Sequence, residues 1–388
     1  MSRGAAVAGT LSCLAALLIA AACQARRELG DPLPGLTPEQ QERFAAGQVE
    51  FERTFAPETG LGPLFNADSC GECHEEPVTG GPGDEVETHV AVFDPIRSFC
   101  DPLADKGGPV FQQHATPALT AAMGIDKEPI PAAATVVAGR STPDLFGFGL
   151  LDAVPDAAIL ALADPEDKNN DGISGRPNRF VDGRLGRFGR KALVPTLHEF
   201  NAGAFPTEQG VTDPEAPAEE SIGGAPIPPG VDPTPDPEIA QRALNLTDDF
   251  VRFLAPPSPH VLDAEGKRGQ KLFGTLGCVA CHVPALRTGD HAVKALRDKK
   301  VYAYTDLLLH EMGPDLADIC FGLATPSEFR TEPLMGISAS SVFLHDGRAK
   351  TLDEAIRLHG GEALAARNRF ASLSSRDREA LLKFVRSL

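Results

Sequence analysis

The sequence contains no Trp, only two Tyr and only four Met among its 388 residues. A core of this size therefore has to rely on 21 Phe, on aliphatic side chains, or on a bound aromatic cofactor. Positive charge is also scarce, because 36 Lys and Arg stand against 54 Asp and Glu, a formal net charge of −18. An acidic surface repels phosphate backbones, so we expect no nucleic-acid partner.

Long apolar runs are missing too. The longest, residues 11–22, is too short for a membrane-spanning helix, which needs about 20 residues. With Arg3 before it and small residues at its end, it predicts a signal peptide over residues 1–22. Ala20-Ala21-Ala22-Cys23 resembles a bacterial lipobox, which would place a lipid anchor on Cys23; the alternative is ordinary cleavage before Cys23. We expect the periplasm or the outer face of a bacterial cell envelope. With the lipid anchor, the protein would be an outer-membrane lipoprotein whose only membrane contact is Cys23.

The eight cysteines fall into distinct groups. Cys13 leaves with the signal peptide, and four others form two Cys-x-x-Cys pairs. An odd thiol is unfavourable in an oxidising compartment, and acylation of Cys23 would remove it. Cys100 and Cys320 then remain as a candidate disulfide, which depends on a distance that the sequence does not give.

Two segments carry the strongest chemical signal: Cys70-Gly-Glu-Cys73-His74 and Cys278-Val-Ala-Cys281-His282. Cys-x-x-Cys-His is the attachment signature of c-type haem. Two thiols one helical turn apart add to the vinyl groups of the porphyrin, and the adjacent His becomes the proximal iron ligand. We therefore predict two covalently bound haem c groups, held by Cys70, Cys73, His74, Cys278, Cys281 and His282, with His74 and His282 on the two irons.

A zinc site and a redox dithiol are the alternatives to haem. A Cys₄ zinc site needs four sulfurs at one point, yet the two pairs are about 200 residues apart. Zinc would also leave the two adjacent His residues unexplained. A thioredoxin-like dithiol would need a strand before it and a helix after it.

The chain divides at a Pro-rich acidic segment. Residues 206–237 contain nine Pro and no Lys or Arg, which is typical of an extended linker or loop. Helical signals dominate elsewhere, such as the capping box Thr37-Pro38-Glu39-Gln40. We predict a mainly α fold of two cytochrome c-like haem domains with long loops. The N-terminal domain would span residues 23–205 and the C-terminal domain residues 238–388.

Residues 167–178 suggest a calcium loop. Asp167, Asn169 and Asp171 precede Gly172 at the spacing that opens a D-x-[DN]-x-[DN]-G loop. Asn178 stands at the twelfth position, where an EF-hand has Glu. We predict bound Ca²⁺, and the alternative is an Asx-rich turn.

Several longer stretches resemble bacterial di-haem cytochrome c oxidoreductases. That branch is described as peroxidase-like or as "thiol oxidoreductase", and it is related to di-haem cytochrome c peroxidases. The resemblance covers nearly all of the mature chain. It departs at Arg190, where we expect a Trp between the haems. The matching stretches are residues 60–70, 140–155, 171–178, 307–313, 343–349 and 359–362.

The resemblance implies that the two haems have different roles. The N-terminal haem opens a coordination position and meets peroxide. The C-terminal haem is six-coordinate and relays electrons from a small redox protein or a quinol-linked donor. We therefore expect an enzyme that reduces hydrogen peroxide or another small substrate. The alternatives are a non-enzymatic electron-transfer cytochrome and an oxidoreductase acting on a thiol or another small organic molecule.

The sixth ligands of the two haem irons have no local motif as clear as Cys-x-x-Cys-His. For the C-terminal haem we predict Met312 as sixth ligand, with His310, Met335 and Tyr304 as alternatives. For the N-terminal haem we predict His114 as a removable ligand, with His89 as the alternative.

Two further residues are candidates for catalysis. Asp152 would act as an acid or base, and its alternative role is to cap a helix or turn. Arg140 would stabilise negative charge near a haem, and its alternative role is a salt bridge to a propionate. We expect His345 and His359 to hydrogen-bond locally in their Gly-rich turns.

Overall fold

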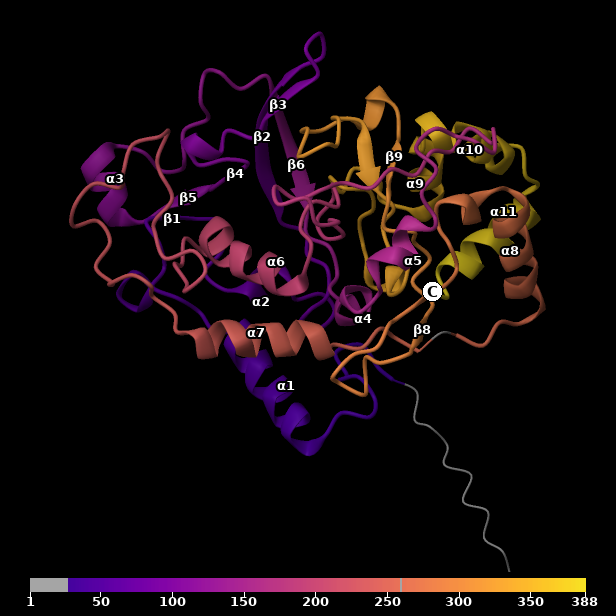
Figure 1. The fold of residues 1–388 in the computed structure, drawn as a ribbon, viewed down its shortest axis with the longest axis horizontal. Helices are drawn as coiled ribbons and strands as arrows, with labels where there is room; N and C mark the ends of the chain where they lie inside the picture. The colour runs from indigo at the N-terminus through magenta and orange to yellow at the C-terminus, as the bar shows by residue number, and fades with distance from the viewer. Residues whose placement is uncertain (1–26, 259) are drawn as a thin grey trace, which may run out of the picture.

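The computed structural model describes residues 27–258 and 260–388 (Figure 1). The predicted signal peptide and Cys23 lie outside these residues. Helices make up 32% of the structure and strands 13%. The prediction of a mainly α fold of two cytochrome c-like domains is therefore wrong. Within the described ranges, no helix is both long and apolar enough to cross a bilayer.

Two long helix pairs dominate the helical part. Helix α1 (Pro38–Phe51) packs against α7 (Gln241–Phe253), and α8 (Ala264–Thr275) packs against α11 (Ser375–Val385). Helix α7 comes after the predicted linker, yet its packing partner lies near the start of the described chain. Each pair therefore joins a helix just ahead of an attachment motif to a helix far beyond it.

Both crossings depend on a glycine. A Cβ atom on Gly47 of α1 would lie 2.2 Å from the Leu246 carbonyl oxygen of α7. A Cβ atom on Gly269 of α8 would lie 1.9 Å from the Ala380 carbonyl oxygen of α11. Only glycine allows backbones to approach this closely. The predicted capping box at the start of α1 is confirmed, because the Gln40 N–H donates to Thr37 Oγ1 at 3.2 Å and the Thr37 N–H to Gln40 Oε1 at 2.9 Å.

The main sheet was missed by the sequence analysis. Its central strand β2 (Val86–Asp94) pairs antiparallel with β3 (Phe99–Asp101), β4 (Val110–Phe111) and β6 (Val136–Ser141). β2 reads Val-Glu-Thr-His-Val-Ala-Val-Phe-Asp, and its β-branched residues favour a strand. The β2–β3 hairpin extends from the body of the molecule at the top of Figure 1.

Short elements complete the chain. There are also three two-stranded antiparallel sheets among the described residues. They pair β1 (Leu64–Phe65) with β5 (His114–Ala115), β7 (Leu286–Arg287) with β8 (Lys300–Val301), and β9 (Leu309–Glu311) with β10 (Glu328–Arg330). The other α-helices are α2 (Cys70–Cys73), α3 (Pro117–Met123), α4 (Phe148–Asp152), α5 (Asp156–Leu160), α6 (Leu197–Ala204), α9 (Leu352–Leu358) and α10 (Leu364–Ala371). Short 3₁₀ turns span Pro57–Thr59, Ala104–Lys106, Cys278–Ala280, Pro314–Leu316, Ile337–Ala339 and Gly361–Ala363, and a π turn spans Phe205–Gln209.

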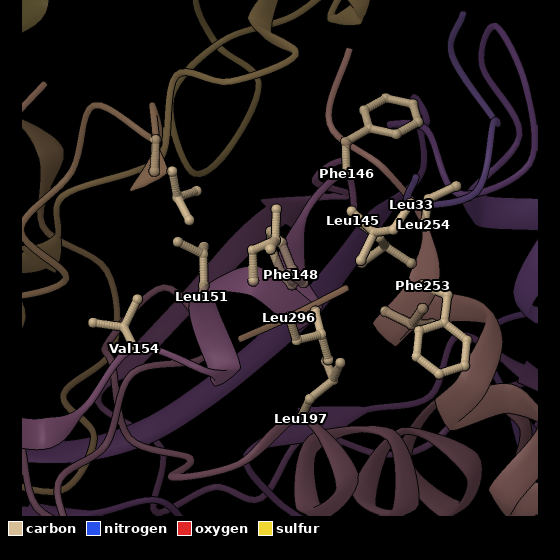
Figure 2. Packing of buried hydrophobic residues seen from close by; sticks show 14 of the residues in the cluster. Leu33, Leu145, Phe146, Phe148, Leu151, Val154, Leu197, Phe253, Leu254 and Leu296 are labelled. Atoms are coloured by element: carbon tan, nitrogen blue, oxygen red, sulfur yellow. The ribbon is translucent and has the colours of Figure 1, made fainter. Parts of the chain in front are cut away.

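The largest apolar core crosses the predicted domain boundary. Figure 2 shows Leu151 of α4, Leu254 at the end of α7 and Leu296 of the C-terminal half in one cluster. All three are fully buried. The two halves therefore share a core, so neither half buries its apolar surface independently of the other.

The Pro-rich segment packs on the body of the protein. Val211 is fully buried, and Ile222 and Val231 join Leu64 and Leu119 in a small apolar cluster. The candidate disulfide is confirmed, because Cys100 of β3 is bonded to Cys320 across 220 residues of sequence. This bond ties the β2–β3 hairpin to the C-terminal half.

Candidate functional site

The first attachment motif is a single helical turn. Helix α2 begins after Ser69, whose hydroxyl accepts the Glu72 N–H at 3.0 Å. The turn places Cys70 and Cys73 half-buried and unpaired, with His74 directly after them. His74 Nδ1 lies 3.2 Å from the Gly81 carbonyl oxygen. A Cβ atom on Gly81 would clash with the Glu76 carbonyl oxygen at 1.8 Å, so glycine is needed to bring this acceptor to the ring.

The second motif repeats this geometry. The His282 N–H donates to the Cys278 carbonyl oxygen at 3.0 Å, and His282 Nδ1 lies 2.9 Å from the Tyr304 carbonyl oxygen. Tyr304 has a φ of 52°, an uncommon conformation for a residue with a side chain, and it directs this carbonyl. The ring centroids of Phe273 in α8 and His282 are 6.2 Å apart. Those of Phe51 in α1 and His74 are 5.9 Å apart, so each histidine has a phenylalanine ring beside it.

Both histidines have the tautomer and the neutral ring that a metal ligand needs. A hydrogen bond from Nδ1–H to a carbonyl fixes the tautomer and leaves Nε2 as the ligand atom. Burial lowers the pKa of His74 and lowers that of His282 to about 4. Both rings are therefore neutral at pH 7, as a ligand must be.

The thiols fit thioether attachment better than the alternatives. Burial raises the pKa of Cys70 to about 12 and that of Cys278 to about 11, so neither is a reactive thiolate. In the described part of the chain, one group of four His, Cys, Asp or Glu side chains has ligand atoms within 4.8 Å of one another, and it contains no cysteine. A Cys₄ zinc site is therefore absent there. That group is Glu219, Asp232, Asp236 and Glu238.

A large cavity opens at the second motif. Its volume is about 530 Å³, within the usual range of cofactor sites. Cys278, Cys281 and His282 form part of its wall, and Phe273 and Leu381 contribute apolar surface from α8 and α11. The donor set and the cavity together fit a porphyrin.

Met312, the predicted sixth ligand, also lies in the wall of this cavity, and its role stays a prediction. Met335 is instead buried in the main core. Tyr304 supplies its backbone carbonyl to His282.

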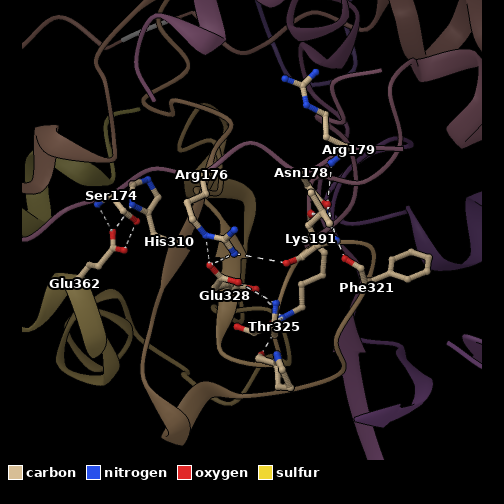
Figure 3. Close-up of polar contacts among 12 residues, drawn as sticks. Ser174, Arg176, Asn178, Arg179, Lys191, His310, Phe321, Thr325, Glu328 and Glu362 are labelled. Atoms are coloured by element: carbon tan, nitrogen blue, oxygen red, sulfur yellow. Dashed lines mark hydrogen bonds and ion pairs between the residues drawn. The ribbon is translucent and has the colours of Figure 1, made fainter. Parts of the chain in front are cut away.

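His310 lines the cavity but has both ring nitrogens occupied. Nδ1 lies 2.7 Å from Glu362 Oε2 and Nε2 lies 2.8 Å from Asp306 Oδ2. Although burial lowers the pKa of His310, hydrogen bonds to Asp306, Cys281 and Glu362 raise it to about 12. His310 is therefore a charged imidazolium with no free nitrogen for iron. Figure 3 shows it beside Glu362, which also accepts the Ser174 hydroxyl at 2.6 Å.

Carboxylates surround the first motif. Burial and the charge of Glu87 raise the pKa of Glu208 well above its ordinary value. Glu87 Oε2 lies 2.9 Å from His89 Nε2. Burial raises the pKa of Cys73, and the charges of Glu208 and Glu87 raise it further, which places both carboxylates near the attachment site. Sequence reasoning missed Glu87 and Glu208, because no local pattern connects them to the motif.

The other predicted residues have different surroundings. His114 is exposed on β5, and its ring lies 5.5 Å from that of Phe65. Asp152 Oδ2 pairs with Arg252 at 2.6 Å, and Asp152 Oδ1 accepts the Leu197 N–H at 3.0 Å at the start of α6. The contacts of Asp152 are those of a helix cap and an ion pair. Catalytic and ligand roles for these residues stay predictions.

Arg140 and Arg190 belong to buried polar networks. Arg140 donates to Asp318 Oδ2 at 2.8 Å, and Lys191 Nζ lies 2.7 Å from Asp318 Oδ1. Arg190, at the position where we expected Trp, lines the cavity and pairs with Glu332 at 3.0 Å. Arg190 also donates to the Ser141 carbonyl oxygen of β6 at 2.9 Å, so a guanidinium connects the cavity wall to the main sheet.

The predicted calcium loop lies beside the same cavity. Asn169 and Asp171 are exposed, and Asn169 Oδ1 accepts the Asp171 N–H at 2.9 Å. This hydrogen bond is one that an Asx turn makes, and the Ca²⁺ site stays a prediction. Asp171 and Ile173 contribute to the cavity wall.

The chain was compared with curated proteins and with solved structures. No curated protein matches it. Among solved structures, hydrazine synthase of Kuenenia stuttgartiensis is 15% identical over 100% of both chains, with a TM-score of 0.40. A MauG-like protein associated with microbial copper homeostasis is 16% identical over 92% of both chains, with a TM-score of 0.41. The di-haem peroxidase BthA from Burkholderia thailandensis is 16% identical over 91% of this chain and 86% of its own, with a TM-score of 0.43. Likeness at this level carries no conclusion about function.

The family assignment comes from a different comparison. The model of the family described as "Di-haem oxidoreductase, putative peroxidase" matches residues 133–388, well over half of the chain. That region contains the second attachment motif and the cavity. The chain therefore belongs to the di-haem oxidoreductase family of peroxidase-like proteins.

Proposed function

We propose that this protein is an exported di-haem c-type oxidoreductase that reduces hydrogen peroxide with electrons from a small redox partner. One observation carries the proposal. Two Cys-x-x-Cys-His segments hold their histidines in the same way, with Nδ1 on a backbone carbonyl, yet their surroundings differ. Half-buried carboxylates lie near the first, and a cavity with further candidate ligands opens at the second.

Each motif would hold one haem c. Cys70 and Cys73 would form thioethers at the first site, with His74 as the iron ligand. The second group of ligands is Cys278, Cys281 and His282. Bound haem would supply one-electron redox chemistry at each site. The disulfide between Cys100 and Cys320 supports export, since such bonds persist in oxidising compartments.

The residues near the first motif suit proton transfer. Although burial raises the pKa of Glu87, His89 and Arg140 lower it, so Glu87 is ionised. Burial and the charge of Glu87 raise the pKa of nearby Glu208 well above its ordinary value, which favours its protonated form. Two carboxyl groups whose pKa values are pushed apart form an acid and a base. Glu208 would hold the proton that peroxide cleavage requires, and Glu87 would accept one.

The test mixes the half-reduced, matured protein with hydrogen peroxide in a stopped-flow spectrometer. We expect turnover, and we expect Glu208→Gln to slow it at least about 10²-fold, because Gln keeps the shape but cannot transfer a proton. Glu166→Gln is the matched control, since Glu166 is an exposed partner of Lys168.

Two results would count against a peroxidase. No turnover, with both irons six-coordinate and low-spin in every redox state, would leave an electron-transfer cytochrome. Turnover only with a thiol or another organic substrate would replace peroxide as the substrate.

A further inference from the structure

Helix α9 presents one face to the cavity at the second motif. Leu352, Ala355, Ile356 and His359 all line the cavity, and their spacing of three, four and seven residues places them on one side of a helix. Thr351 starts this helix by accepting the Glu354 N–H at 3.1 Å. The imidazole of His359 therefore belongs to the cavity wall.

The ring of His359 has the same kind of hydrogen bond at Nδ1 as the rings of His74 and His282. His359 Nδ1 lies 2.8 Å from the Ala355 carbonyl oxygen. Across residues 27–258 and 260–388, no hydrogen bond to His359 Nε2 is found, and the same holds for His282 Nε2. His359 is also close enough to His282 to lower its pKa. Of the imidazoles that line the cavity among the described residues, those of His282 and His359 have Nδ1 on a backbone carbonyl and no hydrogen bond at Nε2.

The backbone after His359 is held in place. A Cβ atom on Gly360 would lie 2.6 Å from the Met312 carbonyl oxygen, and one on Gly361 would lie 2.1 Å from the Glu311 carbonyl oxygen. The two glycines therefore let the end of α9 press against the segment of β9 and Met312. Such close packing fixes the position of the ring that a ligand needs.

The other candidate ligands compare unfavourably. His310 has each ring nitrogen on a carboxylate. Met335 is buried in the main core, away from the cavity wall. Met312 does line the cavity, but among the described residues its sulfur has no hydrogen bond comparable to the one between His359 and the Ala355 carbonyl.

We propose that His359 Nε2 is the sixth ligand of the C-terminal haem, opposite His282, and that this iron is therefore bis-histidine ligated. The inference rests on the proposed covalent haem. Methionine ligation raises the potential of a haem. A bis-histidine iron lacks this effect, so the electron donor has to be a reductant of correspondingly lower potential. Met312 then contributes only apolar surface to the cavity wall.

The experiment uses the matured full-length protein and compares optical, EPR and redox data for four forms. In the native protein we expect a low-spin C-terminal haem without the near-infrared sulfur-to-iron charge-transfer band. His359→Gly should lose this low-spin signal, and added imidazole should restore it. His359→Met should create the sulfur band and raise the potential. Met312→Leu should leave the spectrum and the potential unchanged.

The opposite pattern would overturn the inference. A native sulfur band that Met312→Leu removes and His359→Gly retains would assign the ligand to Met312. Intact mass separates this failure from that of the proposed function. A chain that carries two haem adducts but shows methionine ligation refutes only the role of His359, whereas a chain without adducts refutes the haem c proposal itself.

Discussion

Among single residues, Asp318 stands out because it lies at the centre of a buried cluster of charged side chains. Its carboxylate pairs with Arg140 and Lys191, and all three side chains are buried. Burial raises the pKa of Asp318, but the two cations lower it, so the group is ionised. We expect Asp318→Asn to lower the free energy of unfolding by about 3–5 kcal/mol, because two buried cations lose their counter-charge. Urea denaturation measures this loss.

An exposed ion pair provides the comparison. Glu379 pairs with Arg386 at 3.1 Å, and both side chains are more than half exposed. Glu379→Gln should change the free energy of unfolding by about 1 kcal/mol or less. If Asp318→Asn is no more costly than this control, the buried cluster does not stabilise the fold.

Residue-level chemistry was predictable only where it was local. The two attachment motifs could be identified because each places its thiols and imidazole within five consecutive residues. Glu208 lies more than 130 residues from Cys73 in the sequence, and no pattern joins them. His359 had a recognisable turn, Leu-His-Gly-Gly-Glu, but its place in the cavity wall depends on which face of α9 is buried.

At the level of secondary-structure elements, the two glycine crossings are the strongest constraint. We expect Gly269→Ala to lower the free energy of unfolding by about 3 kcal/mol, the upper end of overpacking costs, because its Cβ would lie 1.9 Å from a backbone oxygen of α11. Separation of α8 from α11 should also disturb the haem that we propose in the cavity beside them. Thermal unfolding followed at the haem absorbance and by circular dichroism reports both effects.

Gly274 is the matched control in the same helix. It is exposed, and a Cβ atom there meets no atom within 4 Å. Gly274→Ala should raise the stability by up to about 1 kcal/mol through helix propensity. Equal effects of the two substitutions would show that the α8–α11 crossing tolerates a side chain.

Elements differ in how well sequence predicts them. The start of α1 was correct because a capping box is a local pattern. Strand β2 was missed, since its inward and outward residues do not alternate cleanly and its pairing partners lie up to 55 residues away in the sequence. The Pro-rich segment has a linker composition, but apolar residues such as Val211 pack it onto the body.

For the whole molecule, buried carboxyl groups should make stability depend on pH. Burial raises the pKa of Glu128 and Glu219 to about 8 and that of Glu220 and Glu238 to about 7. A raised folded-state pKa favours folding while the group is protonated, and this contribution is lost as the pH rises through that value. Because these groups ionise near pH 4.5 in the unfolded chain, we expect the melting temperature to fall between about pH 4.5 and pH 8 and to level off above that.

Glu128→Gln isolates one of these groups. Glu128 is almost fully buried and accepts the Gln112 N–H at 3.1 Å. Between pH 6.5 and pH 8 the variant should lose about 2 kcal/mol less stability than the native chain. Glu58→Gln, at an exposed position, should follow the native curve. Parallel curves for Glu128→Gln and the native protein would contradict the prediction.

The bond between Cys100 and Cys320 also bears on how the protein is made. Its two thiols meet only after 220 residues of chain have come together, whereas Cys70 and Cys73 are immediate neighbours that meet at once. On the proposed export route, oxidation of the chain would therefore close the wrong ring first. The proposed haem attachment then requires an order of events, in which the neighbouring thiols stay reduced until they bind porphyrin and the distant pair closes afterwards.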